Sequence, residues 1–400
     1  MYKYLFLLVT FISLAQSQTS LEFQQALERR LTTDAGLRAL HKHQSALTLN
    51  AKAEIAFSAT EFETVLEDFG QAEIEIAARQ TFEAPSIRKN KLELFNTDKL
   101  RLNTDISAYR DQVHYQLSNY FLKAFGTHHL LELVKGRLSI LNLIFTWQTK
   151  RFEAGALAES ELIRSRLAVA ELSAEVAQIE FLLINLAEEF SIYLELPISV
   201  DMLPTELPPY ANAETLNLTW NRVEEAPAIR YQEAQVAHLR AGKRLADTPL
   251  ITSLSVTAGL KLLPEFSQRV PVLGFSLESP LFSQRNTLVQ AKELEIQASL
   301  DDMELIKSTL KLKKHQWLTE WDMNNSQLDL LQATLIPEAT ILQEQINQEY
   351  RAGARQYLDV LDAQNLLTDL QAKALDLQVD MATQLFEMNL TLGVKIYEFK

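Results

Sequence analysis

The stretch EYRAGARQYLDVLDAQNLLTDL, residues 349–370, has a counterpart in the first half of the chain. Aligned with RFEAGALAESELIRSRL, residues 151–167, it places Gly353 on Gly155, with an alanine on each side of both glycines. The spacing between the two copies is 349 − 151 = 198 residues. A repeat of this length indicates one duplicated unit rather than a solenoid of short modules.

The sequence after each glycine has apolar residues at alternating spacings of three and four, which is the seam pattern of a coiled coil. In the first half this seam consists of Leu162, Ser165, Val169, Leu172, Val176, Ile179, Leu183, Leu186, Phe190 and Tyr193. At the same offset, the second half has Val360, Ala363, Leu367, Leu370, Ala374, Leu377, Met381, Gln384 and Met388. Only Gln384 interrupts the second seam, so both halves are predicted to contain a long helix in the same register.

A second long helical stretch precedes each glycine, over about residues 86–151 and about residues 284–350. At 1.5 Å per residue, each would form a rod of roughly 100 Å. Pro337 is expected to kink or divide the second rod, because proline lacks the amide donor that a helix requires. Each half is therefore predicted to be a long antiparallel helical hairpin, with tips near residues 153–160 and 350–358.

Before each rod the apolar period changes from about 3.6 residues to two, which indicates strands. AEIEIAARQTF, ITSLSVTAGLKL and VLGFSLESPLF alternate clearly, whereas FETVLEDFG is assigned as a strand from its position in the repeat. The strand hairpins are predicted over about residues 62–83 and 250–282. Strands of about ten residues are long enough to cross an outer membrane when tilted. Four strands alone cannot close a barrel, so the alternatives are an oligomer that shares one barrel and a small soluble sheet that caps a helical bundle.

The organisation that follows is mainly α with a small β part, built from two repeats. Residues 1–17 have a lysine, an apolar run and a small-x-small site, which are typical of a secretory signal peptide. The first repeat covers residues 18–196 and the second covers residues 221–400. Residues 197–220 are rich in proline and are predicted to be an irregular equatorial linker.

Composition excludes several classes of function. The chain has no cysteine, which rules out thiol catalysis and disulfides, and its net charge of −14 argues against non-specific nucleic-acid binding. The histidine pairs His41/His43 and His128/His129 do not have the spacing that places two ligands on one helix face. No nucleophile, phosphate-loop or paired-carboxylate motif is present. We therefore predict no enzyme activity, no metal site and no cofactor.

The signal peptide, the duplicated strand and helix hairpins and the central linker together resemble the TolC-like outer membrane efflux protein family. The motifs that carry this resemblance are YRAGARQYLDVLDAQ, FEAGALAESEL, APAIRYQEAQVAHLRAGKRLADTPLITSLSV and LGFSLESPLF. It implies a homotrimer with a shared 12-stranded β-barrel in the cell outer membrane and an α-helical barrel in the periplasm. It also implies a passive exit duct in a tripartite efflux system, together with a periplasmic adaptor (membrane fusion) protein and an inner-membrane pump of the RND type.

A narrower resemblance lies in LEDFGQAEIEIAARQTFEAPSIRKNK, residues 66–91, which is similar to the corresponding segment of CzcC-type ducts. The residues that carry it are Asp68, Phe69, Gly70, Glu73, Gln80, Glu83 and Arg88. It implies export of heavy-metal cations, with the metal chosen by the pump. Two alternatives remain: a duct of the same fold for drugs or type I protein secretion, and a periplasmic coiled-coil scaffold.

The family resemblance also assigns roles at the second tip. Asp359 and Asp362 match paired aspartates that constrict the pore at its periplasmic entrance. Residues i and i+3 share a helix face, so a trimer would place six carboxylates around one axis, where they would attract cations. The alternative is two acids on a solvated helix.

A latch at the entrance is implied in the same way. Tyr350 and Arg355 match a tyrosine and an arginine that hold the entrance shut by bonding polar residues of the neighbouring hairpin. Ser160 and Glu161 match those partners, and bonds to Glu161 would be charge-assisted. The alternative is a core aromatic and an exposed arginine.

Overall fold

The structure is a computed structural model, which describes residues 21–56, 59–68, 72–207, 223–247, 251–263, 268–279 and 285–393. The predicted signal peptide, residues 1–17, lies outside these ranges, and so does the linker from residue 208 onward. Among the described residues, the linker has one short 3-10 helix, Val200–Met202.

Each repeat contains a strand hairpin followed by a helical hairpin, so the predicted fold class is confirmed. The first repeat has strands β1 and β2 and helices α3 and α4, at Glu61–Asp68, Ala72–Glu83, Pro85–Glu153 and Glu159–Leu194. The second has strands β3 and β4 and helices α7, α8 and α9, at Ser253–Leu263, Gln268–Glu278, Arg285–Leu330, Ile336–Arg351 and Tyr357–Leu392. Three further helices were not predicted: α1, α2 and α6, at Phe23–Thr33, Ala35–Ile55 and Pro227–Ala246.

Two compact units divide the chain differently from the two repeats. The first unit comprises residues 1–34, 110–222 and 311–400, and the second comprises residues 35–109 and 223–310. Each unit therefore draws segments from both repeats. The first contains α1, α4, α8 and α9, and the second contains α2, α6 and the whole sheet.

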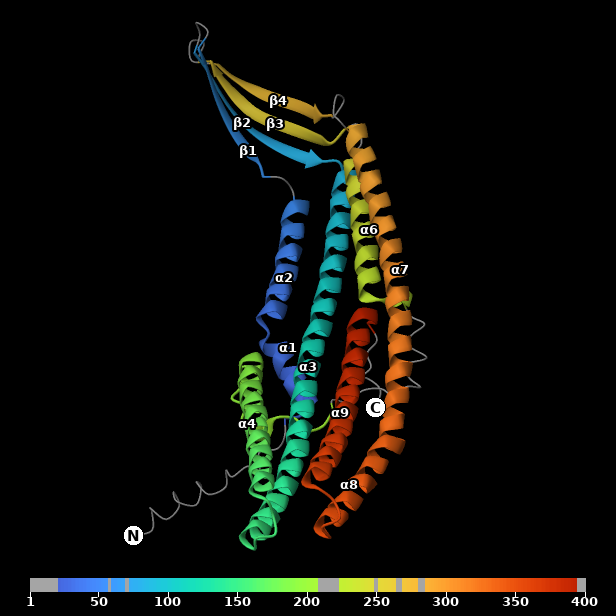
Figure 1. The fold of residues 1–400 in the computed structure, drawn as a ribbon. Coiled ribbons are helices and arrows are strands. Elements are labelled where there is room, and N and C mark those ends of the chain that lie inside the picture. The colour runs from blue at the N-terminus through green and yellow to red at the C-terminus, as the bar shows by residue number, and fades with distance from the viewer. Residues whose placement is uncertain are drawn as a thin grey trace, which may run out of the picture. The chain divides into compact units, whose positions relative to one another are not determined.

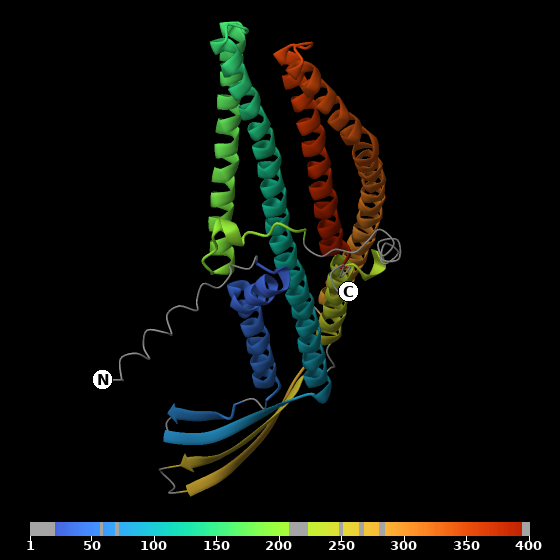
Figure 2. The ribbon, with the colours of Figure 1, turned by 90° about the horizontal axis from the view of Figure 1, so that it is seen from below.

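The predicted heptad seams form much of the core of the first unit. Along α4, Leu172, Leu183 and Phe190 are buried, and along α9 the same register buries Val360, Leu367 and Met388. Figures 1 and 2 show α4 running beside the later part of α3, and α9 running beside α8.

Gln384, the polar interruption of the second seam, is buried and satisfied. Its amide donates to the carbonyl oxygen of Trp317 at 3.1 Å and to a carboxylate oxygen of Glu320 at 3.2 Å. A buried amide that finds acceptors costs far less than an unpaired one. The seam therefore tolerates this residue.

The second long helix is interrupted beside Pro337, as predicted. Helix α7 ends at Leu330, residues Leu331–Leu335 form a single π-helical turn, and α8 begins at Ile336. Proline removes one main-chain donor and its ring crowds the preceding turn. The wider π turn accommodates both effects, as is common where a helix is kinked.

Helix α6 lies in the second unit and is held by polar contacts to α3 and α7. Arg244 donates through Nε and Nη2 to the two carboxylate oxygens of Glu93 at 3.0 and 2.5 Å. The amide of Gln232 donates to the carbonyl oxygen of Ser299 at 2.9 Å. The bidentate arginine pair fixes the orientation of α6 as well as its position.

The second unit also contains the antiparallel sheet, in the order β1-β2-β3-β4. The β2–β3 ladder joins the strands of the two repeats and runs from Ile74 opposite Leu262 to Glu83 opposite Ser253. Strand β1, assigned from its position alone, pairs along its whole length with β2. This ladder makes the four strands alternate in phase, so apolar side chains from all four share one face.

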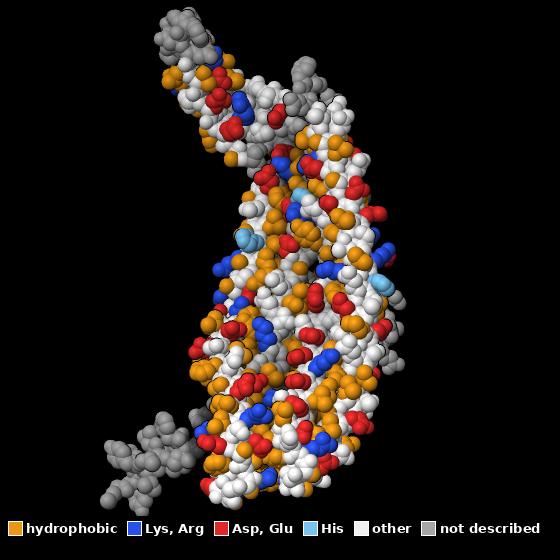
Figure 3. Space-filling model, viewed as in Figure 1, with side chains coloured by type: hydrophobic (Ala, Val, Ile, Leu, Met, Phe, Trp, Pro, Cys, Tyr) orange, Lys and Arg blue, Asp and Glu red, His pale blue; other side chains and the backbone are white. Residues whose placement is uncertain are grey.

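That apolar face is largely open. Its exposed large residues are Phe62, Leu66, Ile76, Phe82, Leu254, Leu260, Leu273, Phe275 and Leu277. Figure 3 shows hydrophobic side chains along the β1 edge of the sheet, with charged side chains beside them. A contiguous apolar surface of this kind marks a face that meets lipid or protein.

The opposite, polar face is concave where Gly259 of β3 faces Ala77 of β2. A Cβ atom added at Gly259 would lie 2.6 Å from the carbonyl oxygen of Ile76 and 2.8 Å from the Cα of Ala77. Side chains converge on the concave side of a bent sheet, so only glycine fits here. The curvature of the strands is visible in Figure 1.

We expect Gly259→Val to disrupt the sheet, because the added side chain would overlap the backbone of β2. Overpacking of this kind costs about 1–3 kcal/mol or more. Circular dichroism and the midpoint of thermal unfolding of the full-length protein measure the effect. Gly274→Ala is the matched control, since its added Cβ would lie 3.5 Å from the nearest atom, a Thr257 side-chain carbon. Equal stability of both variants would contradict this account of the curvature.

One histidine is part of the core of the first unit. His114 is 3% exposed, and its ring lies 5.1 Å from that of Phe23 in an edge-on arrangement. Burial lowers the pKa of His114 to about 4, because the charged imidazolium would lose its hydration. The folded protein therefore holds this histidine neutral over most of the physiological pH range.

This histidine should make the first unit acid-sensitive. The unfolded chain takes up the proton near pH 6.5 and the folded chain only near pH 4, so stability is full above pH 6.5 and falls as the pH drops toward 4. The loss should total about 3 kcal/mol. In denaturation curves at pH 7 and pH 4.5, His114→Leu should flatten this pH dependence. The same substitution at the exposed His315 should leave the pH dependence as it is.

Candidate functional site: the two hairpin tips

The first tip ends α3 with a glycine cap. The amide of Ala156 donates to the carbonyl oxygen of Arg151 at 2.8 Å, and the amide of Gly155 donates to that of Phe152 at 2.8 Å. Gly155 has φ +71°, in the left-handed region that favours glycine. This pair of bonds is the Schellman motif, which satisfies the carbonyl groups at a helix end.

The second tip repeats the same cap at the end of α8. The amide of Ala354 donates to the carbonyl oxygen of Glu349 at 2.9 Å, and that of Gly353 to the oxygen of Tyr350 at 3.0 Å. Gly353 has φ +80°. Gly155 and Gly353 thus have the same left-handed backbone conformation, and both tips turn the chain in the same way.

The paired aspartates lie in the first turns of α9. Asp359 is the third residue of the helix, and its Oδ2 accepts a hydrogen bond from the amide of Gln356 at 3.1 Å, within a capping box. A carboxylate in the first turn also interacts favourably with the helix dipole. Asp362 is exposed one turn later on the same face. Asp359 therefore caps the helix as well as contributing charge.

The two aspartates begin a longer acidic stripe, which the sequence analysis did not identify. It occupies the positions one residue before the seam from Val360 to Met381, with the same alternating spacing, and consists of Asp359, Asp362, Leu366, Asp369, Lys373, Asp376 and Asp380. All but the partly buried Asp359 are exposed. The sequence could have revealed this stripe, because its positions follow directly from those of the seam.

The equivalent positions of α4, 198 residues earlier, have no such uniform charge. They are Glu161, Arg164, Ala168, Glu171, Glu175, Gln178 and Leu182. The seam is therefore shared by the two repeats, whereas the acidic stripe belongs to the second repeat.

Tyr350 joins the two helical hairpins within the chain. It is 4% exposed, and its hydroxyl accepts a hydrogen bond from the amide of the fully buried Gln148 at 2.8 Å. Burial raises the pKa of Tyr350, and the charge of Glu161 adds to this, while Gln148 and Arg151 oppose it. The tyrosine is thus a neutral hydrogen-bonding group in the core beside the tip.

A second contact ties the hairpins on the surface. The guanidinium of Arg351 lies over the ring of Trp147, 4.3 Å from its centroid. Such a cation–π contact contributes about 0.5–1 kcal/mol at an exposed site. The hydrogen bond of Gln148 and this stacked pair involve adjacent residues on both helices, so α3 and α8 meet at a defined register.

The predicted latch residues have other partners within this chain. Nε of Arg355 donates to a carboxylate oxygen of Glu349 at 2.7 Å, and both side chains are about half exposed. Ser160 and Glu161 lie in the first turn of α4. In the described part of the chain, no hydrogen bond joins either of them to Tyr350 or Arg355.

Comparison with known proteins identifies a family that this arrangement resembles. Residues 222–394, which contain most of the second repeat, match the family described as outer membrane efflux protein. The second repeat is therefore similar to that family. The match agrees with the predicted location in the outer membrane and periplasm, and with a passive channel rather than an enzyme. Among curated proteins, no sequence matches the chain.

Solved structures of this fold cover nearly the whole chain. The CusC structure, described in terms of folding and transmembrane channel formation, matches with a TM-score of 0.75 and 16% identity over 93% of this chain and 92% of that one. The outer-membrane channel OprN matches with a TM-score of 0.76 and 16% identity over 93% and 89%. VceC of Vibrio cholerae matches with 0.71 and 14% over 93% and 96%. Both repeats of the chain thus share this fold.

Two features are absent from the described residues, namely a membrane-spanning helix and a metal-binding cluster. None of the described helices has the length and apolar character needed to span a bilayer. Within the same residues, no group of three histidine, aspartate or glutamate side chains is arranged to hold a metal ion.

Removing the hydroxyl of Tyr350 should weaken the junction between the hairpins. In Tyr350→Phe, the amide of Gln148 would remain buried without its acceptor, which costs about 1–3 kcal/mol. Chemical denaturation of the purified protein measures this loss. Tyr231→Phe is the control, because Tyr231 is 39% exposed on α6. A loss that is equal in both variants would show that the Gln148 bond contributes nothing specific.

Proposed function

We propose that this protein is the outer-membrane exit duct of a tripartite efflux system for heavy-metal cations. It would work as a homotrimer, with a periplasmic adaptor protein and an inner-membrane pump of the RND type. The sheet would join the sheets of two other protomers in one 12-stranded barrel, its apolar face toward lipid. The duct itself would be passive, and the pump would select the metal.

The acidic stripe of α9 is the observation that carries the cation assignment. Five of its seven positions are aspartate and one is lysine. In a trimer, Asp359 and Asp362 would add six carboxylates around one axis, and the rest of the stripe would extend this charge along the helix. Rings of carboxylates in a pore concentrate cations and exclude anions.

The concave face of the sheet adds to this charge. In the observed register, the charged residues on this face whose side chains the structure describes are Glu61, Glu63, Glu75, Arg79, Glu83, Lys261 and Glu278. Carboxylates therefore outnumber cations by five to two. If the barrel closes with this face inward, its lumen is acidic as well.

We also propose that Tyr350 and Arg355 form the entrance latch with Ser160 and Glu161 of a neighbouring hairpin. The observation in support is that all four lie at or beside the tips, with Glu161 close enough to influence the pKa of Tyr350. Arg355 would exchange its bond to Glu349 for one to the neighbour. The exposed position of Arg355 permits that exchange.

A duct for drugs or for type I protein secretion is the second candidate, because the fold serves any cargo. The acidic stripe favours metal cations over drugs and over secreted proteins as the cargo. The family match of residues 222–394 favours an outer-membrane duct over a periplasmic coiled-coil scaffold.

Conductance across a planar bilayer tests the charge. Wild-type channels should be cation-selective, and Asp359→Asn/Asp362→Asn should lower the cation-to-anion permeability ratio several-fold, because the ring charge disappears while the side-chain size is kept. Asp301→Asn/Asp302→Asn, which removes two charges from the exposed surface of α7, is the matched control. Anion-selective wild-type channels, or an equal loss in both variants, would rule out the acidic ring.

The same recordings can test the latch with Tyr350→Phe/Arg355→Ser. Loss of both bonds should raise the single-channel conductance without changing the ion selectivity. An unchanged conductance would rule out the proposed latch but would not contradict the proposed duct.

A further inference from the structure

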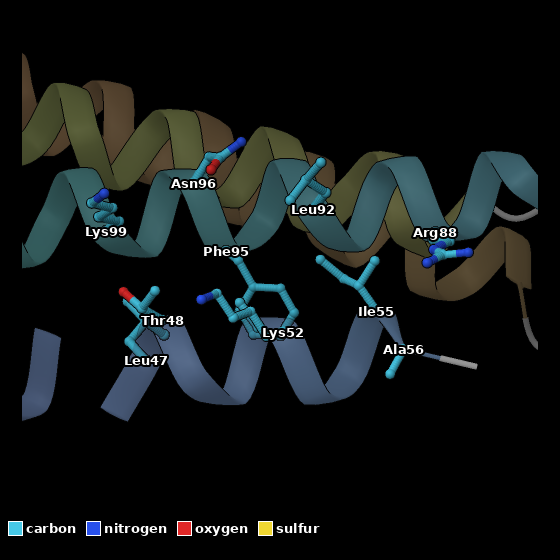
Figure 4. Close-up of a pocket in the computed structure, with 11 residues that line it drawn as sticks. Leu47, Thr48, Lys52, Ile55, Ala56, Arg88, Leu92, Phe95, Asn96 and Lys99 are labelled. Carbon is cyan, nitrogen blue, oxygen red and sulfur yellow. The ribbon is translucent and has the colours of Figure 1, made fainter. Parts of the chain in front are cut away.

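A cavity of about 400 Å³ lies between α2 and the first turns of α3, within the unit that contains the sheet. Its apolar wall includes Leu47, Ile55, Leu92 and Phe95. Figure 4 shows Ile55 from α2 and Phe95 from α3 pointing into the gap between the two helices. Its volume falls in the range of about 300–1,000 Å³ that is usual for small-molecule sites.

Three cations border the same cavity. Arg88 and Lys99 lie toward opposite ends of it on α3, and Lys52 extends from α2 between them (Figure 4). From Arg88 to Lys99 is eleven residues of helix, or about 16 Å. The site therefore combines a long apolar wall with basic groups, which suits an anionic amphiphile.

The cavity continues toward the sheet. A second hollow of about 510 Å³ shares Ile55, Ala56 and Arg88 with the first and is also lined by Phe82 of β2. Phe82 is 40% exposed on the apolar face of the sheet. The apolar side chains of Phe82, Ile55 and Phe95 therefore line a continuous route from that face into the cavity, beside the paired charges of the second hollow.

The carboxylates nearest the cavity are already paired. Glu54 and Glu83 both bind the ammonium of Lys91, at 2.9 and 2.7 Å. In the part of the chain that the structure describes, Lys52 and Lys99 form no ion pair. Two such lysines beside an apolar cavity stand out in a chain with a net charge of −14, and they provide the charge that an anionic group would need.

We propose that this cavity binds a phospholipid from the periplasmic leaflet of the outer membrane. The phosphate would lie between Lys52 and Lys99, and an acyl chain would follow Phe95 and Ile55 toward Phe82 and the membrane. Basic side chains beside a membrane-embedded segment commonly bind lipid headgroups, with their own aliphatic stems against apolar surface. The inference rests on the sheet lying in the membrane, and it is independent of the cargo.

A peptide fits this site less well. Every lining residue belongs to α2, to the turn that ends it or to α3, and the main-chain groups within these helices are already hydrogen-bonded. An extended peptide would find no free main-chain partners here, whereas the edge of a sheet would offer them. An acyl chain needs none.

Native mass spectrometry of the full-length, detergent-solubilised assembly tests the proposal by titration with phosphatidylglycerol. We expect one lipid retained per chain, and about tenfold weaker retention in Lys52→Gln/Lys99→Gln. Lys42→Gln/Lys89→Gln is the matched control, since it removes two exposed lysines of the same two helices outside the cavity. Leu92→Gln, at a position 46% exposed, tests the apolar wall and should also weaken retention.

Three results would overturn the lipid site. Equal losses in the two lysine pairs would mean bulk electrostatic attraction. Displacement of the lipid by inorganic phosphate would mean an anion site without a role for the acyl chain. Crosslinks from residue 52 to a second copy of the chain would mean that the cavity is an interface between protomers. Channels formed by the Lys52→Gln/Lys99→Gln variant should conduct like the wild type. A failure of the lipid-site proposal is therefore distinguishable from a failure of the proposed duct function.

Discussion

The pairing of β2 with β3 is the interaction on which the organisation of the sheet depends. It is the ladder through which the strands of the two repeats meet, from Ile74 opposite Leu262 to Glu83 opposite Ser253. A slip of one residue would turn every side chain of one hairpin to the other face. The close fit of Gly259 against Ala77 opposes that slip, because a residue with a side chain at position 259 would overlap the partner strand. The observed register gives the sheet one apolar and one charged face. The proposed orientation of these faces toward the membrane and the lumen depends on that register.

The helical hairpins show how a duplicated unit diverges. The seam and the glycine cap are the same in both repeats, since buried positions and left-handed turns accept few residue types. The exposed stripe is under no such packing constraint. It is mixed along α4 and strongly acidic along α9, so the two hairpins differ in surface charge while they share the same seam. The periodicity that fixes the seam also aligns the aspartates, because a stripe one residue away repeats with the same spacing.

Features set by local chemistry could be predicted from the sequence, and those set by distant partners could not. Heptad spacing located α4 and α9, alternation located three strands, and Gly155 and Gly353 located both tips. Helix α2 was missed because its face is weakly apolar, with Leu37 its one buried residue among those described. Gln148 was missed as the partner of Tyr350 because it lies 202 residues away and follows no motif. Pro337 predicted an interruption of the helix, but the π turn that absorbs it depends on how the neighbouring residues pack.

Asp359 shows how one residue could serve both the fold and the proposed pore. Only its Oδ2 takes part in the capping bond to the Gln356 amide, so the carboxylate keeps acceptor capacity and its charge for ions. Its position in the first turn also makes that charge favourable for the helix, whereas an acid deeper in an apolar core would destabilise it. Asparagine in its place retains an oxygen that can accept the same bond and loses the charge. A change in selectivity in that variant would therefore report on the charge and not on a damaged helix start. The cap and the proposed ring thus place compatible demands on a single carboxylate, because acidic charge at a helix N-terminus does not destabilise the hairpin.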